Sequence, residues 1–185
     1  MAKEAKSKII QRSMFVGIGA FFLALLVSSI SQGIMEQISS ATIASLILLV
    51  IVVFGIVFDL IGTAVTAADE EVFHAMATKR VPGGQQGAYL VRNADRVANI
   101  CNDVVGDVSA SISGALGAGV ALLISKGNAD NLFVEIIILG MVAGLTVGGK
   151  AYGKTFAIQN SNDIIFMVAK ILDKMNLNFA IKRKK

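Results

Sequence analysis

The feature that most constrains the fold is an apolar run over residues 43–68, in which Asp59 is the single charged residue. A run of this length crosses a bilayer, which takes about 20 residues as an α-helix. Its many β-branched residues do not oppose a helix, because backbone groups in lipid must find hydrogen bonds within their own segment. The run therefore predicts a membrane-spanning helix.

The composition extends this prediction to most of the chain. Of 185 residues, 55% are hydrophobic and 16% are charged, against about 45–50% and about 25% in soluble domains. The net charge of +4 resides in tails and loops, with no tract that interleaves basic and aromatic residues, so we expect no nucleic-acid partner. A single cysteine, Cys101, and a single histidine, His74, exclude an intrachain disulfide and a zinc or haem site built within one chain.

Three further segments are candidates for crossing the membrane. Residues 13–35 carry no charge and predict a first crossing. The basic residues before this run and the serines near its end also fit a cleaved signal peptide, but we expect an uncleaved helix. Residues 97–124 predict a crossing whose first half is polar, and residues 132–149 predict a last one with Glu135 and Lys150 at its ends.

The remaining segments are expected at the membrane surface. Residues 69–96 are polar and contain the only proline, within a turn at residues 80–84 between two amphipathic pieces. Residues 164–172 resemble an interfacial amphipathic helix, and a basic tail follows at 182–185. The sequence thus predicts an all-α, polytopic membrane helical bundle of four transmembrane helices with a juxtamembrane amphipathic belt. The expected divisions are 1–42 (tail and extra helix), 43–157 (three-helix domain with its belt at 69–96) and 158–185.

Lysine and arginine set the expected orientation, because cytoplasmic segments hold the excess of these residues. The N-terminal tail, the loop with Lys79, Arg80, Arg92 and Arg96, and the tail after Lys150 are basic, whereas the two opposite loops share only Lys126. This bias predicts a plasma-membrane protein with both termini in the cytoplasm.

Two sets of polar residues lie inside the predicted crossings, where charged groups normally face protein or water. Both sets share a helical face by their spacing, and oxygen ligands of these kinds suit magnesium or calcium. We name them the first polar stripe (Asp59, Thr63 and Thr66) and the second polar stripe (Asn99, Asp103 and Asp107). Together they predict an oxygen cage for a divalent cation. The alternative is that Asp103 and Asp107 are solvated near the interface, paired with Arg92 or Arg96, and that Asp59 lies near headgroups.

Small residues recur every four positions on the last two predicted helices, a spacing that lets backbones approach closely. They are Gly140, Gly144 and Gly148 on one helix, and Gly106, Ala110, Gly114 and Ala118 on the other. The sequence leaves open whether the contact is within one chain or between two copies; we favour a homodimer. His74 is expected in a solvated loop and Cys101 as a packing residue.

Three short motifs stand between residues 43 and 157, namely Gly62-Thr-Ala-Val-Thr-Ala67, Arg92-Asn-Ala-Asp-Arg96 and Val105-Gly-Asp107. They resemble segments in the transmembrane domain of the CorB/CorC and cyclin-M magnesium transporter family. Gly62-Thr-Ala-Val-Thr-Ala67 is similar to its Ser-Glu-Thr-Ala-Leu-Thr segment. Gly87 and the run Arg92-Asn-Ala-Asp-Arg96 follow, the latter similar to its Glu-Asn-Pro-Asp-Arg, and Val105-Gly-Asp107 is similar to its Ile-Gly-Asn. The resemblance implies three crossings, a juxtamembrane belt and a partly dehydrated magnesium between the helices, held by side-chain and carbonyl oxygens.

Carried over by position, Gly62 and Asp107 correspond to the family's Glu and Asn, while Thr63 and Thr66 retain hydroxyls. Ala94 stands where the family has a proline, and we expect the family's cytoplasmic nucleotide-binding pair to be absent. The sequence therefore favours membrane transport or binding of a divalent cation, most readily Mg²⁺, between the second and third crossings. The alternative is a non-transporting membrane scaffold or regulatory partner built on the same fold. No nucleophile is paired with a base, so we expect no enzyme.

Overall fold

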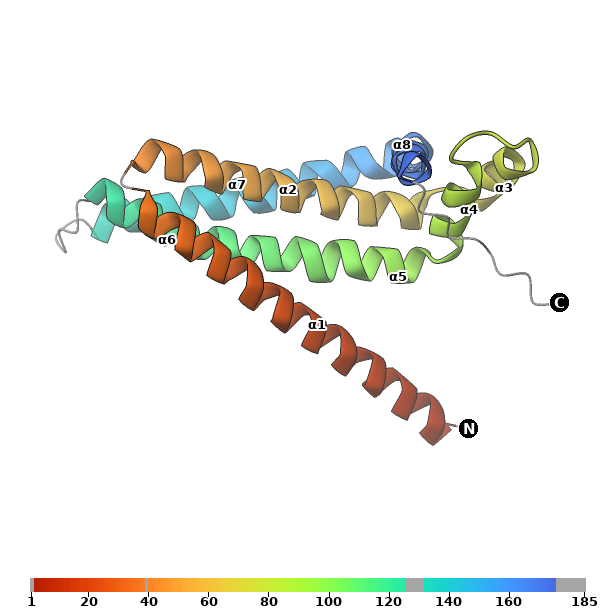
Figure 1. Cartoon of the computed structure of the whole chain (residues 1–185), viewed down its shortest axis with the longest axis horizontal. Helices are drawn as coiled ribbons and strands as arrows, with labels where there is room; N and C mark the ends of the chain where they lie inside the picture. The colour runs from red at the N-terminus through yellow and green to blue at the C-terminus, as the bar shows by residue number, and fades with distance from the viewer. Residues whose placement is uncertain (1, 39, 126–131, 176–185) are drawn as a thin grey trace. The chain divides into compact units, whose positions relative to one another are not determined.

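The computed structural model describes residues 2–38, 40–125 and 132–175, and this part of the chain is all helical (Figure 1). The all-α prediction is therefore confirmed. The helices are α1 (Ala2–Gln37), α2 (Ala41–Ala67), α3 (Glu70–Thr78), α4 (Gly84–Arg92), α5 (Ala94–Ala98), the π-helix η1 (Asn99–Gly106), α6 (Asp107–Ser125), α7 (Leu132–Gln159) and α8 (Ser161–Lys174).

Three of the described helical segments are long and apolar enough to cross a membrane: Ala41–Ala67, Ala94–Ser125 and Leu132–Gln159. The chain is accordingly a membrane protein. The first predicted crossing falls within α1, whose apolar part, Met14–Ile30, is shorter than these spans. The expected loop with Lys126 and the basic tail at 182–185 lie outside the described residues.

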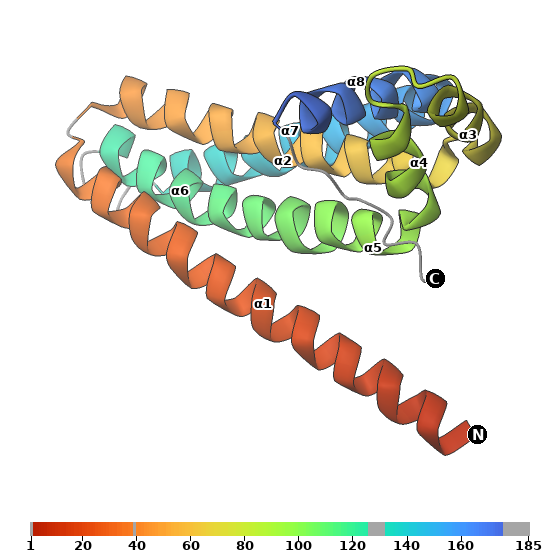
Figure 2. The ribbon, with the colours of Figure 1, turned by 45° about the vertical axis from the view of Figure 1, so that its right-hand side comes forward.

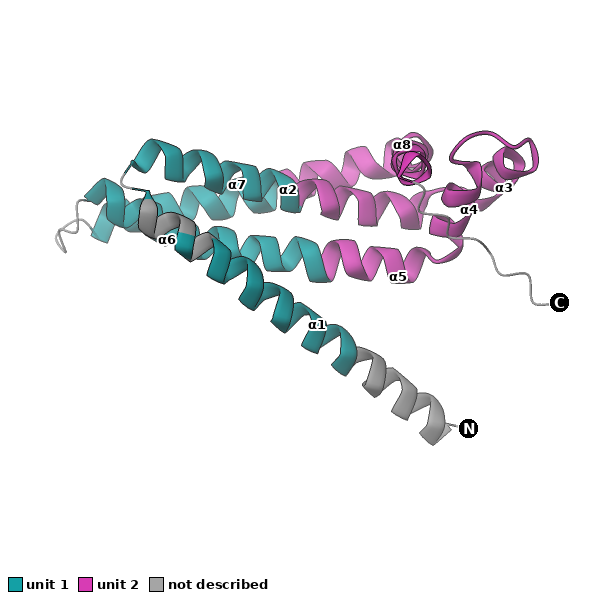
Figure 3. Ribbon diagram, viewed as in Figure 1, with its two compact units in different colours: residues 1–55, 104–148 teal, residues 56–103, 149–185 magenta. Residues whose placement is uncertain are grey.

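The chain forms two compact units, coloured separately in Figure 3. Unit 1 holds residues 1–55 and 104–148, and unit 2 holds residues 56–103 and 149–185. The long helices α2 and α7 each contribute to both units, because the division falls within them.

In unit 1 the helices pack against each other through apolar side chains. In it α1 contacts α6, and Ile112, Leu116 and Val120 on α6 are buried. Gly117 lets α6 approach α7 closely, since a Cβ at this position would lie 3.2 Å from Cγ2 of Val142. Other apolar side chains are exposed, among them Phe133, which is 76% exposed. Exposed apolar surface on this scale is typical of helices that face lipid or another protein.

Unit 2 has the denser core, in which Phe73 and Ile165 are completely buried. Helix α4 packs against α3 and α8, and both views show the three side by side (Figures 1 and 2). Ser161, Ile165 and Ala169 form the buried face of α8 at a spacing of four residues. The Nε2 of Gln86 donates a hydrogen bond of 2.6 Å to Oδ1 of Asp173, which joins α4 to α8.

The predicted turn at residues 80–84 is present and separates α3 from α4. It requires two residues with left-handed backbone, Arg80 (φ 54°) and Gly83 (φ 85°), a conformation that favours glycine. Gly87 then brings α4 onto the ring of Phe73, where a Cβ would overlap the ring. These two glycines fix how α4 packs into unit 2.

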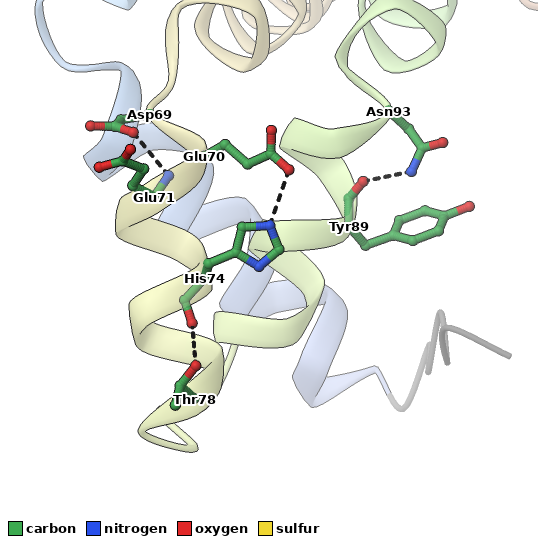
Figure 4. Close-up of polar contacts among 7 residues, drawn as sticks. All are labelled: Asp69, Glu70, Glu71, His74, Thr78, Tyr89 and Asn93. Carbon is green, nitrogen blue, oxygen red and sulfur yellow. Dashed lines mark hydrogen bonds and ion pairs between the residues drawn. The ribbon is translucent and has the colours of Figure 1, made fainter. Parts of the chain in front are cut away.

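His74 is exposed, as expected, but it lies on α3 rather than in a loop (Figure 4). Asp69 caps this helix by accepting a hydrogen bond of 2.9 Å from the Glu71 backbone N–H, which begins the helix before the histidine. The Nε2 of His74 lies 3.0 Å from Oε1 of Glu70, one turn earlier. The loop prediction was wrong because capping at Asp69 outweighs the polar composition.

Candidate functional site

Asp59 on α2 is the centre of the site. It is only 3% exposed and lies within a candidate membrane span. Its Oδ1 is 3.7 Å from Nζ of Lys150, and its Oδ2 is 3.8 Å from Nζ of Lys154. The two lysines are four residues apart on α7 and therefore share one face of that helix. One buried carboxylate thus lies between two ammonium groups.

The helix contact that produces this grouping depends on two glycines of α7. A Cβ at Gly149 would overlap the Ile56 side chain, and one at Gly153 would lie 3.6 Å from Ile56 and 3.8 Å from Leu60. Both contacts advance along the two helices in the same direction, so α2 and α7 run parallel here. Small residues allow such close approach in membranes, and the close approach brings Asp59 within reach of Lys150.

The ion pairs leave the carboxylate incompletely hydrogen-bonded. Distances of 3.7 and 3.8 Å exceed the usual 2.7–3.2 Å of a hydrogen bond. Oδ2 of Asp59 is buried and has no hydrogen-bond partner among the described residues. A buried acceptor without a partner is costly, about 1–3 kcal/mol and more for a charged group. Asp59 therefore retains capacity to accept a donor or to bind a cation.

Asn102 on the π-helix η1 has a second buried side-chain oxygen, comparable with Oδ2 of Asp59. Its Oδ1 has no hydrogen-bond partner in the part of the chain that the structure describes. The Asn102 amide occupies the space that a side chain at Gly62 would fill, and Cβ of Cys101 lies 3.0 Å from the same point. Gly62 follows Asp59 by three residues, so the two positions lie on neighbouring parts of one face of α2. Stretches of π-helix are frequent at functional sites.

The first polar stripe is confirmed as a helical face, but its members differ in environment. Asp59 is buried and Thr63 is half-buried, whereas Thr66 is exposed. The Thr63 hydroxyl donates to the Asp59 carbonyl at 2.9 Å, and the Thr66 hydroxyl donates to the Thr63 carbonyl at 2.8 Å. Both hydroxyls therefore bond to their own helix and keep lone pairs for other partners.

The second polar stripe faces outward. Asn99 and Asp103 on η1 and Asp107 at the start of α6 are all exposed, and Asp107 belongs to the other compact unit. Among the described residues, no three His, Cys, Asp or Glu side chains form a group that could hold a metal ion. Of the six predicted ligands, only Asp59 combines a formal charge with burial.

Three residues of the site were not predicted: Lys150, Lys154 and Asn102. Lys150 was expected to mark the end of its helix, and this was wrong, because α7 continues to Gln159. The apolar run ends at Gly149, but the helix does not, since Lys150 finds a carboxylate partner on α2. The usable signal was a lysine pair at a spacing of four residues directly after the predicted crossing at 132–149, since charged residues at the edge of a membrane span normally pair with each other or with opposite charges.

No model of a known protein family matches the chain, and neither a curated protein nor a solved structure matches it.

Proposed function

We propose that the protein binds a divalent cation, most readily magnesium, and carries it across the plasma membrane, with Asp59 as the central ligand. The observation that carries the proposal is a buried carboxylate oxygen in a membrane span that lacks a hydrogen-bond partner among the described residues. Carboxylate and amide oxygens are the ligands that magnesium prefers. The buried amide oxygen of Asn102, which lies against Gly62 on α2, is our candidate for a second ligand.

A small ligand set fits magnesium better than calcium. Magnesium usually keeps several of its waters and takes one or two carboxylates from the protein, whereas calcium takes six to eight oxygens. One buried carboxylate, one amide oxygen and the Thr63 hydroxyl match the smaller requirement. The exposed second polar stripe, with Asp103 in unit 2, would attract a hydrated cation before it loses water. We retain Asp107 as a further proposed ligand, and only the resemblance to the magnesium transporter family supports this assignment.

The wider arrangement belongs to the same proposal. We infer that α1 supplies a fourth crossing, that both termini are cytoplasmic, and that α3, α4 and α8 lie at the membrane surface as a belt. The glycine face of α7 is open, since no described atom outside α7's own local backbone lies within 4 Å of a Cβ added at Gly140, Gly144 or Gly148. A homodimer would cover this face with a second copy.

Flux in proteoliposomes tests the proposal. Purified protein is reconstituted with a magnesium-sensitive dye inside the vesicles, and dye response is recorded after external magnesium is added. Asp59→Asn removes the charge while keeping the shape, and we expect it to lower the initial rate by about tenfold or more. Asp163→Asn, an exposed carboxylate at the start of α8, is the matched control and should transport like the parent. Equal rates for parent and Asp59→Asn would overturn the proposal.

A non-transporting scaffold is the second candidate, and the two lysines favour it. A carboxylate already paired with Lys150 and Lys154 has a structural role without any ligand, as many buried ion pairs do. This candidate predicts vesicles that stay silent for the parent itself, while Asp59→Asn lowers only the free energy of unfolding.

A further inference from the structure

Asp59 already has two positively charged neighbours before any cation arrives. One carboxylate faces two ammonium groups, at 3.7 and 3.8 Å. Unit charges about 4 Å apart interact strongly in a protein interior, where the effective dielectric constant is far below that of water. A divalent cation that approached the carboxylate would be repelled by both ammonium groups. It therefore binds only if an ammonium group withdraws.

The two lysines differ in how easily they withdraw. The Lys154 side chain is 52% exposed, whereas that of Lys150 is 17% exposed. A lysine has a flexible four-carbon stem with a strongly hydrated head, and it can extend that head toward water while the stem stays on apolar surface. Lys154 is consequently the residue that can leave Asp59 at the smaller cost.

The oxygen that Lys154 faces is also the one left without a hydrogen bond. Lys154 lies 3.8 Å from Oδ2, and Oδ2 is the buried carboxylate oxygen for which the described residues provide no donor. Lys150 lies against Oδ1 instead. The more exposed ammonium group therefore faces the carboxylate oxygen that is better able to bind a cation.

Resting on the function proposed above, we infer that Lys154 is a built-in competitor of the transported cation. Its ammonium group neutralises Oδ2 of Asp59 while the site is unloaded, and cation binding is an exchange in which Lys154 moves to water. Lys150 remains on Oδ1 and keeps part of the carboxylate charge neutralised. This exchange makes Lys154 a determinant of affinity, although it contacts no ion.

Magnesium affinity of lysine variants tests the exchange. The full-length protein in detergent is titrated with magnesium chloride at constant ionic strength, and binding is followed by calorimetry. Lys154→Met keeps the apolar stem and removes the competitor, so the dissociation constant should fall at least about tenfold. Lys150→Met is the second variant and should also tighten binding. Lys174→Met, an exposed lysine at the end of α8, is the control and should bind like the parent.

The outcomes separate the exchange from the proposed function. Each single variant leaves Asp59 one lysine partner, and size-exclusion elution confirms the fold before titration. If Asp59→Asn abolishes binding but neither lysine variant tightens it, the exchange is overturned while the proposed site stands. If Asp59→Asn binds magnesium like the parent, or if no variant binds it, both are overturned. A parent that binds too weakly to measure, with a measurable Lys154→Met, supports the exchange.

Discussion

The two polar stripes look alike in sequence and differ in the structure. Both repeat oxygen-bearing side chains at helical spacing within a candidate membrane span. In the first, Asp59 is buried and paired with lysines from α7. In the second, Asn99, Asp103 and Asp107 are all exposed. Periodicity thus identifies residues on one face, but the packing of other helices decides whether that face is inside.

The deciding feature is the approach of a neighbouring helix. Gly149 and Gly153 allow α7 to pack against α2 beside Asp59, and the same segment of α7 provides Lys150 and Lys154. A buried charge requires a compensating partner, so the lysines and the burial of Asp59 are two aspects of one arrangement. The exposed stripe has no such requirement.

Removing the carboxylate from each stripe is the strongest test of this comparison. Asp59→Ala removes the buried carboxylate that Lys150 and Lys154 both contact, and losing one member of a buried ion pair costs about 3 kcal/mol or more. Asp103→Ala, at an exposed position, should change the free energy of unfolding by less than about 0.5 kcal/mol. Both are measured by denaturation in detergent. Equal losses for the two variants would contradict the assignment of Asp59 to the inside.

Adding a methyl group beside each stripe gives the next largest effect. At Gly62 the new Cβ would overlap the Asn102 amide, so Gly62→Ala should destabilise the protein by about 1–3 kcal/mol. At Gly114, which continues the second stripe, no described side chain or neighbouring helix lies within 4 Å of an added Cβ. Gly114→Ala should be neutral or stabilising by up to about 1 kcal/mol, because alanine is the better helix former. The same unfolding assay checks both variants. An unchanged free energy of unfolding for Gly62→Ala would contradict the assignment of Asn102 to the site.

Thiol labelling tests whether the two stripes differ in their access to water. In a Cys101→Ala background, Asp103→Cys should react with an impermeant thiol reagent in inside-out vesicles and stay unlabelled in intact cells, because we place this stripe at the cytoplasmic side. Gly127→Cys should show the opposite pattern. Asp59→Cys should react slowly from either side, since the position is buried. Labelling of Asp103→Cys in intact cells would contradict the proposed topology.

The smallest effect on the fold is expected at the open glycine face of α7. Gly144→Leu adds a side chain where no described atom beyond the surrounding turns of α7 lies within 4 Å, so the monomer should unfold as the parent does. If a second copy covers this face, the variant should run as a monomer in multi-angle light scattering while the parent runs as a dimer. An unchanged dimer would assign the face to lipid.

Much of the fold follows from the sequence, because long apolar runs and turn residues have local causes. The helix carrying Asp59, the turn at residues 80–84 and the helix over 164–172 all occur as predicted. The predictions for the end of α7 and for the position of His74 were wrong, because each feature depends on a partner residue. Lys150 pairs with Asp59 within a helix that continues beyond it, and the Asp69 cap begins α3 before His74. The pairing of α7 lysines with an α2 carboxylate is a long-range contact, and periodicity within one helix carries no information about it.

Direct location of a bound ion tests the central claim that a cation binds at Asp59. Manganese replaces magnesium at oxygen sites and scatters anomalously, so a crystal of the full-length protein grown with manganese chloride would reveal it. We expect one anomalous peak about 2.0–2.6 Å from Oδ2 of Asp59, with Lys154 turned toward water and the Asn102 amide oxygen nearby. A peak only beside Asp103 or Asp107, with Lys150 and Lys154 still on Asp59, would contradict the account.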